Sequence, residues 1–74
     1  MMEQVNSQTE MILRYLKDKG SITPYDALKE FGCLRLGARI WDLRDLGYQI
    51  DTVMETHTNK YGKKIAYARY RLKG

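Results

Sequence analysis

Hydrophobic residues recur at helical spacing near the start of the chain. They supply one apolar face, made of Met11, Ile12, Tyr15 and Leu16. Ser7 and Glu10 have the spacing of a capping box, and Gly20 supplies the left-handed residue with which many helices end. The pattern predicts a first helix over residues 8–19.

A second helix is marked by its two ends. Thr23 is a favourable N-cap, and Pro24 suits the first helical position, where its missing N–H costs nothing. Gly32 breaks the pattern, which predicts a helix over residues 24–31 with inward-facing Ala27, Leu28 and Phe31. In the short extended link before this helix, we expect Ile22 to pair with a later hairpin.

A third helix is predicted after a tight glycine turn. It begins near Cys33 or Leu34 and runs to Leu46, where Gly47 stops it. At about 100° per residue, one buried stripe forms from Leu36, Ile40, Leu43 and Leu46. Trp41 lies about 140° from Leu36 and therefore points away from this stripe.

After Gly47 the hydrophobic period changes from helical to two. Residues 48–55 and 63–72 are predicted as strands, joined by turn residues at 59–62. On the returning strand we assign alternate residues to the core, namely Ala66, Ala68, Tyr70 and Leu72. The expected fold is therefore α+β, with three helices followed by a β-hairpin.

The chain has 74 residues, which is enough for one domain. We expect a flexible N-terminus over residues 1–6 and a single domain over residues 7–74. Cys33 is the only cysteine and His57 the only histidine, so an internal disulfide and a zinc site are not expected. The chain has no signal-peptide pattern or membrane-spanning run, and a cytoplasmic location is expected.

An enzyme is not expected, because the chain lacks the usual catalytic groupings. His57 has no partner base or acid, and neither paired carboxylates nor a glycine-rich phosphate loop is present. No cofactor is expected for the same reason.

The net charge of +4 is unevenly distributed. Residues 1–32 carry four bases and five acids, whereas residues 33–74 carry nine bases and four acids. Six of these bases follow His57, with no acid among them: Lys60, Lys63, Lys64, Arg69, Arg71 and Lys73. A basic surface can serve only solubility, but a basic hairpin after two short helices also fits the shape of duplex DNA.

Four residues of the third helix are candidate DNA contacts: Arg35, Ala38, Arg39 and Trp41. An arginine fork matches the O6 and N7 atoms of guanine, and we prefer Arg35 for this role. Arg39 lies at the edge of the buried stripe, where it can instead pair with Glu30 or Asp42. Trp41 either packs inside the domain or contacts a partner. Asp42 and Asp45 oppose groove binding unless each accepts a hydrogen bond from cytosine N4 or pairs with an arginine.

On the hairpin, the candidate phosphate contacts are Lys60, Lys63, Lys64 and Arg69. Tyr61 and Tyr67 are interleaved with these bases, a pattern that also serves stacking on single-stranded nucleic acid. The alternative is that tyrosine simply favours strands.

The order of caps, turns and change of period resembles the winged helix-turn-helix superfamily, and more narrowly the small helix-turn-helix proteins of phages and prophages. The matching residues are Thr23-Pro24, Ala27-Leu28, Phe31-Gly32, Leu36, Ala38-Arg39-Ile40, Asp42-Leu43-Arg44, Gly47-Tyr48, Ile50 and Ala68-Arg69-Tyr70-Arg71-Leu72. The resemblance implies a recognition helix at about 34–46 and a basic wing.

The sequence leaves two main functions open, besides the binding of RNA or of a single strand by the Tyr61 and Tyr67 surface. The first is a phage or prophage transcriptional regulator, or an architectural factor, that binds double-stranded DNA. The second is a winged module that captures a host protein through Trp41, Ile65 and Tyr67, because similar domains also serve as protein-binding modules. The sequence also leaves a homodimer open.

Overall fold

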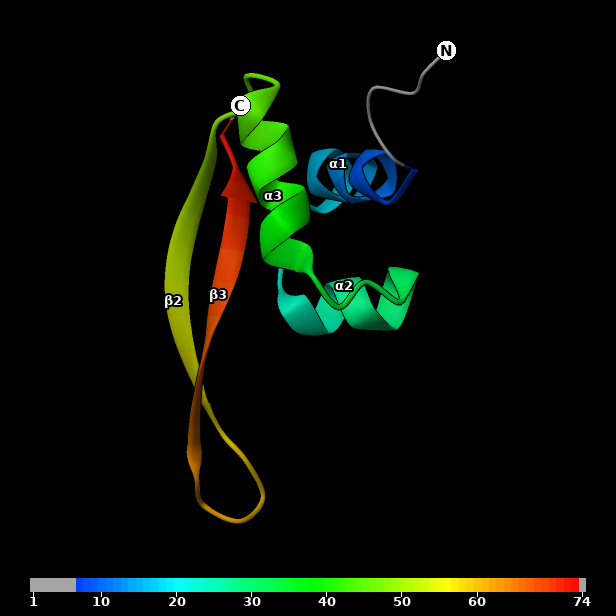
Figure 1. Cartoon of the computed structure of the whole chain (residues 1–74). Coiled ribbons are helices and arrows are strands. Elements are labelled where there is room, and N and C mark those ends of the chain that lie inside the picture. The colour runs from blue at the N-terminus through cyan, green and yellow to red at the C-terminus, as the bar shows by residue number, and fades with distance from the viewer. Residues whose placement is uncertain (1–6, 74) are drawn as a thin grey trace.

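The computed structural model describes residues 7–73 and contains three helices and three strands. In chain order they are α1 (Ser7–Lys19), β1 (Ser21–Ile22), α2 (Pro24–Phe31), α3 (Leu36–Asp45), β2 (Ile50–Thr58) and β3 (Lys64–Leu72) (Figure 1). The α+β arrangement of three helices and a hairpin wing is confirmed. The predicted flexibility of residues 1–6 concerns residues outside the described range.

The bounds of α2 follow from its two caps. The Thr23 hydroxyl accepts a hydrogen bond from the Asp26 N–H, and the Asp26 carboxylate accepts one from the Thr23 N–H, both at 3.1 Å. At the other end Gly32 has a φ of 64°, which a residue with a side chain adopts less readily. The predicted range of α2 is confirmed.

The predicted start of α3 is wrong by two to three residues, because the helix begins at Leu36. The N–H of Cys33 still caps α2 by donating to the Ala27 carbonyl at 3.1 Å. Cys33 is also buried in the core, whereas Leu34 is 82% exposed. The apolar pair therefore belongs to the link between the helices, in which Arg35 is the N-cap of α3.

The three strands form one antiparallel sheet in the order β1-β3-β2. Ile22 lies opposite Tyr70, so the predicted pairing of the short link with the hairpin is confirmed. Strand β2 begins two residues later than expected, because the Tyr48 N–H donates to the Leu43 carbonyl at 3.1 Å and remains tied to the end of α3. It also runs on to Thr58, three residues beyond its predicted end.

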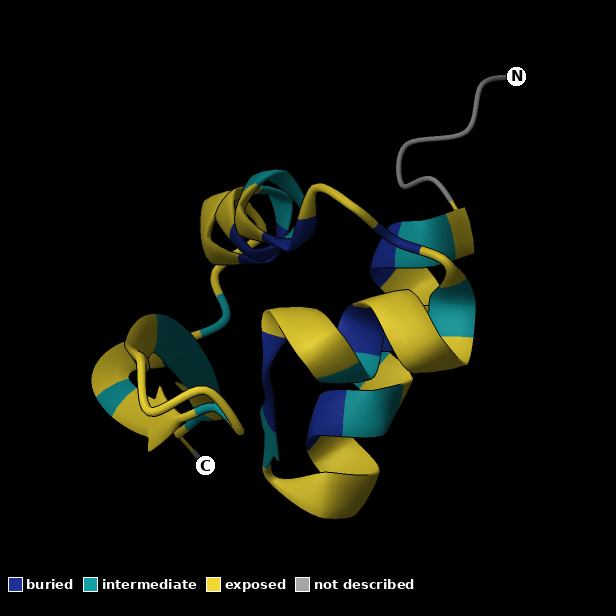
Figure 2. Cartoon of the chain, turned by 90° about the horizontal axis from the view of Figure 1, so that it is seen from below, coloured by how far each residue is buried: buried dark blue, intermediate teal, exposed yellow. Residues whose placement is uncertain are grey.

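The core lies between the three helices and the base of the sheet. Among the described residues the buried apolar side chains are Ile12, Leu16, Ile22, Ala27, Cys33, Leu36, Ile40, Leu43 and Ile50. Tyr15 and Phe31 meet edge to face at its border, with ring centroids 5.8 Å apart. Figure 2 shows these buried segments turned toward one another.

Four residues that were assigned to the core are exposed instead: Met11, Leu28, Leu46 and Ala66. Met11 and Leu28 are 40% and 48% exposed within their helices, and Leu46, the C-cap of α3, is 53% exposed. Ala66 is the third residue of β3, near the hairpin turn. Figure 1 shows that the turn end of the hairpin extends beyond the helices. We call residues 50–72, the β2–β3 hairpin, the wing, and residues 7–46 the helical body.

Candidate nucleic-acid interface

One face of α3 is anchored in the core and the opposite face is open to solvent. Leu36, Ile40 and Leu43 are buried, whereas Trp41 is 65% exposed. The outward position of Trp41 is therefore confirmed, and the alternative that it packs inside the domain is wrong. Arg35 is exposed at the first turn, and Ala38 is half-buried between them.

Arg39 is already engaged within the helical body. Its guanidinium lies 3.3 Å from the Asp42 carboxylate, and the Thr9 hydroxyl donates to the same carboxylate at 3.4 Å. The Arg39 side chain is only 21% exposed. Of the two interpretations of Arg39, the structure has the internal pair with Asp42, which also neutralises one of the two aspartates that oppose DNA binding.

Arg44 joins α3 to the wing, a role that the sequence did not reveal. Its guanidinium donates to the Ile50 carbonyl from Nε and Nη2, at 3.0 and 2.7 Å, and Nη2 also donates to the Thr52 hydroxyl at 2.9 Å. A backbone carbonyl of β2 therefore holds Arg44 in place. The nearby Gly37 lies close to Tyr70, so α3 follows the base of the wing (Figure 1).

The end of the wing is a compact turn that displays positive charge. The Asn59 side chain accepts hydrogen bonds from the N–H groups of Tyr61 and Lys63, at 2.9 and 3.0 Å. Tyr61 is 82% exposed, with the Lys60 ammonium 5.5 Å from its ring centroid. Lys63 and Lys64 are exposed next to it. We call Lys60, Tyr61, Lys63 and Lys64 the wing tip.

Arg69 lies further down the wing and is tied to its neighbours. It donates to the Glu55 carboxylate at 2.9 Å and to the Ser21 hydroxyl at 3.0 Å. The hydrogen bonds from Arg69 and from the Tyr67 hydroxyl lower the pKa of Glu55, and the hydrogen bond to Glu55 raises the pKa of Tyr67. These hydrogen bonds hold Arg69 within the wing, so its guanidinium is less available to a phosphate than a free cation would be.

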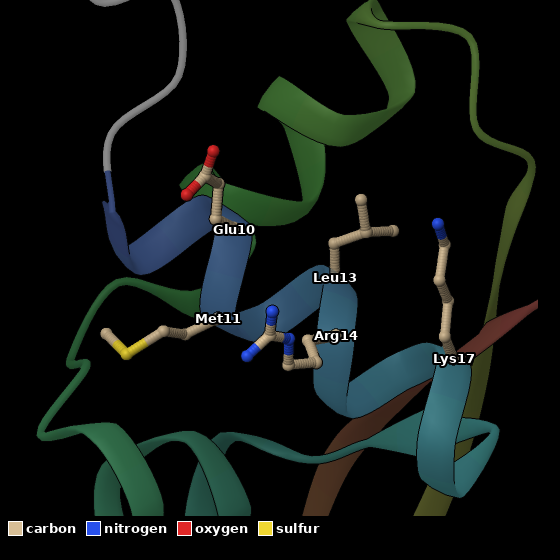
Figure 3. Close-up of a pocket in the computed structure, with 5 residues that line it drawn as sticks. All are labelled: Glu10, Met11, Leu13, Arg14 and Lys17. Atoms are coloured by element: carbon tan, nitrogen blue, oxygen red, sulfur yellow. The ribbon is translucent and has the colours of Figure 1, made fainter.

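Two surface hollows are lined by residues outside α3 and the wing tip. One, of about 600 Å³, lies between the start of α2 and one face of the wing and is lined by Thr23, Pro24, Tyr25, Asp26, His57, Ile65, Tyr67 and Arg69. The other, of about 370 Å³, lies on α1 (Figure 3), where the side chains of Glu10, Met11, Leu13, Arg14 and Lys17 project from successive turns. Within residues 7–73 no cluster of three potential metal ligands is present.

The structure thus brings the predicted contacts together on two elements. Arg35, Ala38 and Trp41 share the open side of α3, and Lys60, Lys63 and Lys64 share the wing tip. Arg39 and Arg69 are held in internal ion pairs. In the described part of the chain, no helix is long and apolar enough to cross a membrane.

Comparison with known proteins gives one match. The model of a family described as a winged helix-turn-helix domain matches residues 7–74. No curated protein and no solved structure matches the chain.

Proposed function

The chain belongs to the winged helix-turn-helix domain family, and from this membership we propose that it binds double-stranded DNA. In this proposal α3 enters the major groove and the wing tip contacts the phosphate backbone. Helices of this size fit the major groove of B-DNA, and a β-hairpin beside the helix can follow the backbone.

The observation that carries the proposal is the unpaired charge of the wing tip. The ion pairs within residues 7–73 are Arg39 with Asp42 and Arg69 with Glu55, and neither involves Lys60, Lys63 or Lys64. Three exposed ammonium groups on one hairpin end attract phosphates and gain free energy by releasing counterions. Arg69 contributes less, because Glu55 already compensates its charge.

The open side of α3 supports a reading role. Arg35 stands at the first turn, where a recognition helix presents side chains to base edges, and its fork can donate to guanine. Ala38 leaves room for close approach, and Trp41 offers a large apolar surface for contact with the thymine methyl group or the sugar. The pairing of Arg39 with Asp42 removes one repulsive charge from this side.

We assign the protein to transcriptional regulation or to DNA architecture, of the kind that small phage and prophage helix-turn-helix proteins carry out. The support for this assignment is the resemblance of the chain to those proteins. One domain of this size offers few base contacts, so affinity should depend strongly on the phosphate contacts.

Salt dependence tests the phosphate contacts. With about four to six contacts, the logarithm of affinity should fall with the logarithm of salt concentration at a slope of about −0.9 per contact. Changing Lys63 and Lys64 together to Ala should make this slope shallower by about 1.8. The matched control changes Lys17 and Lys19 of α1 to Ala and should leave the slope as it is. Duplex binding that is absent at low salt would refute the proposal.

Base reading is tested separately on α3. Arg35→Ala should lose about 1–3 kcal/mol on the preferred sequence and little on random duplex, whereas the double lysine variant weakens both equally. The preferred sequence is obtained by selection from a random pool. If Arg35→Ala keeps the same preference, α3 does not read bases through this residue.

A second function, capture of a protein, is favoured by one observation: a tryptophan that is 65% exposed on α3. Large exposed aromatic residues are typical centres of protein interfaces. Trp41→Ser should keep the free energy of unfolding within about 0.5 kcal/mol, because the indole is exposed. Loss of DNA affinity in this variant supports groove contact. Unchanged DNA affinity together with loss of a co-purifying protein supports the second function.

A further inference from the structure

The outer edge of β2 carries a row of backbone groups without a partner strand in the described part of the chain. The Lys73 N–H donates to the Gln49 carbonyl and the Asn59 N–H donates to the Lys63 carbonyl, both at 2.9 Å. Because hydrogen-bonded residues alternate along an antiparallel ladder, the odd-numbered residues of β2 bond to β3. The even-numbered residues therefore direct their N–H and C=O groups outward.

One end of this edge is already closed. Arg44 donates to the Ile50 carbonyl, which belongs to the outward set. The available edge consequently runs from Thr52 to Thr58. Figure 1 shows β2 at the margin of the sheet, with no helix beyond it.

This edge lacks the features that usually keep strands from pairing with other chains. Exposed edges are commonly protected by proline, lysine or a bulge. The sequence of β2, IDTVMETHT, contains no proline, lysine or arginine, and its register with β3 is unbroken over nine residues. The even-numbered residues of β2 after Ile50 all have uncharged side chains. One of them, Met54, is 64% exposed.

We propose that β2 pairs antiparallel with β2 of a second copy of this chain, about a two-fold axis at Met54. This register sets Met54 opposite Met54 of the partner subunit and Thr52 opposite Thr56 of the partner subunit. Outward groups then meet outward groups, which allows about six interchain N–H···O bonds. Asp51 lies opposite His57 of the partner subunit, so the acidic residue does not face another acid.

The positions of the charged side chains favour this register over the registers with an axis at the residue before or after Met54. An axis at Val53 would set Asp51 against Glu55 of the partner subunit, and an axis at Glu55 would set the two Glu55 carboxylates against each other. Directly opposed like charges destabilise a sheet. An axis at Thr56 would bring Thr52 against the turn residue Lys60 of the partner subunit, where no strand continues.

The arrangement is closed, and it places the two helical bodies at opposite ends of the paired strands. Because the two strands run in opposite directions, each body lies beside the wing tip of the other copy. A contact between β2 and the outer edge of β3 would instead leave a free edge on each side and propagate into longer assemblies. The inference goes beyond DNA binding and does not depend on it, so it is tested on the protein alone.

The first experiment measures the mass of the full chain without DNA by sedimentation, from about 1 to about 300 μM, the range in which small interfaces associate. A monomer–dimer equilibrium is expected. Met54→Pro removes only an outward N–H, and Met54→Lys keeps the backbone but places two like charges at the axis; each should weaken the dimer at least about tenfold. The matched control Ala66→Lys, on β3, should dimerise like the wild type.

Cross-linking then tests the register. Directly opposed residues have Cα atoms about 5.5 Å apart, within disulfide range, so Met54→Cys should form a disulfide-linked dimer under mild oxidation. The two residues of Thr56→Cys would lie more than about 13 Å apart and should not cross-link. The unchanged protein controls for the buried Cys33. A wild-type monomer throughout the range, species larger than a dimer, a Met54→Lys variant that dimerises normally, or preferential linkage through Thr56→Cys would each overturn the proposal.

Discussion

The helical body and the wing are stabilised in different ways. All the buried apolar side chains of the described range lie in the body, in the links of its helices or at Ile50, where the wing begins. From Asp51 to Lys73 no residue is buried. The body therefore gains its stability from burial of apolar surface, whereas the wing depends on its backbone ladder and on the Glu55–Arg69 pair.

Because of this difference, most residues that stabilise the domain are not the residues proposed to contact a partner. Ile50, Tyr70 and Leu72 at the base of the wing belong to the core or pack against it. Side chains nearer the wing tip can change without opening a cavity, so this part of the wing can carry charge and aromatic surface for a partner. The body must keep its packing, and the open side of α3 is the part of it that we propose for contact.

The largest effect is expected for the same substitution made in both regions. Ile40 is fully buried, and Ile40→Ala should lower the free energy of unfolding by about 3 kcal/mol through lost burial and a cavity. Ile65 on the wing is 46% exposed, and Ile65→Ala should cost less than about 1 kcal/mol. Urea unfolding followed by circular dichroism measures both. Equal losses would mean that the wing has an apolar core of its own.

A smaller loss is expected at the start of α2. Thr23→Ala removes the hydroxyl that accepts from the Asp26 N–H and should cost about 1 kcal/mol, or about 4–8 °C in Tm for a domain of this size. Thr23→Ser keeps the hydroxyl and is the matched control. If Thr23→Ser is as unstable as Thr23→Ala, the lost methyl group and not the cap determines the effect.

The helix ends could be predicted from the sequence because their signals are local. Thr23, Pro24 and Gly32 act through their own backbone and nearest turn, and they predicted α2 correctly. The start of α3 could not be predicted from apolar pattern alone. Cys33 is buried because the link dips into the core, and periodicity does not distinguish such a link from a first turn of helix.

The exposed residues of the expected core have a different cause. Periodicity identifies the apolar face of a helix or strand, but it does not tell how far neighbouring elements cover that face. Leu28 and Leu46 lie at the border of a small body, and Ala66 lies beyond it. A domain of this size has too little chain to cover every apolar side chain.

The sequence predicted which residues form the candidate site better than it predicted the hydrogen bonds between them. Helical spacing was sufficient to predict that Trp41 points away from the core, and the distribution of charge along the chain predicted the basic wing tip. The bonds of Arg44 to Ile50 and of Arg69 to Ser21 join residues from different elements, so no spacing along the chain reveals them. For the same reason Arg69 was expected to be a free cation.

The junction between body and wing is tested at Arg44. Arg44→Ala removes the donors to the Ile50 carbonyl and should cost about 0.5–1 kcal/mol, because Arg44 is an exposed residue and water replaces part of the bond. Arg44→Lys cannot donate twice to one carbonyl and should recover little. Hydrogen exchange of the wing amides should rise more than that of α1. A uniform rise would mean that Arg44 stabilises the whole domain and not the junction.

The smallest effect is expected at Glu55 of the wing, and it depends on pH. The hydrogen bonds from Arg69 and Tyr67 lower the pKa of Glu55 in the folded protein below its value in the unfolded chain. The folded protein therefore binds this proton less readily, so the stabilisation is present above the ordinary carboxyl pKa. It is lost as the pH falls through the lowered pKa.

Glu55→Gln removes this titration but keeps a side chain that can still accept a hydrogen bond from Arg69. The wild type should be slightly more stable than the variant near pH 7, and the difference in Tm should shrink as the pH falls toward about 3. Asp45→Asn, an exposed carboxylate on α3, is the matched control. A difference that stays constant with pH would show that the carboxylate charge does not hold the wing. A difference as large as that of Thr23→Ala would break the contrast between a packed body and a wing that depends on its backbone.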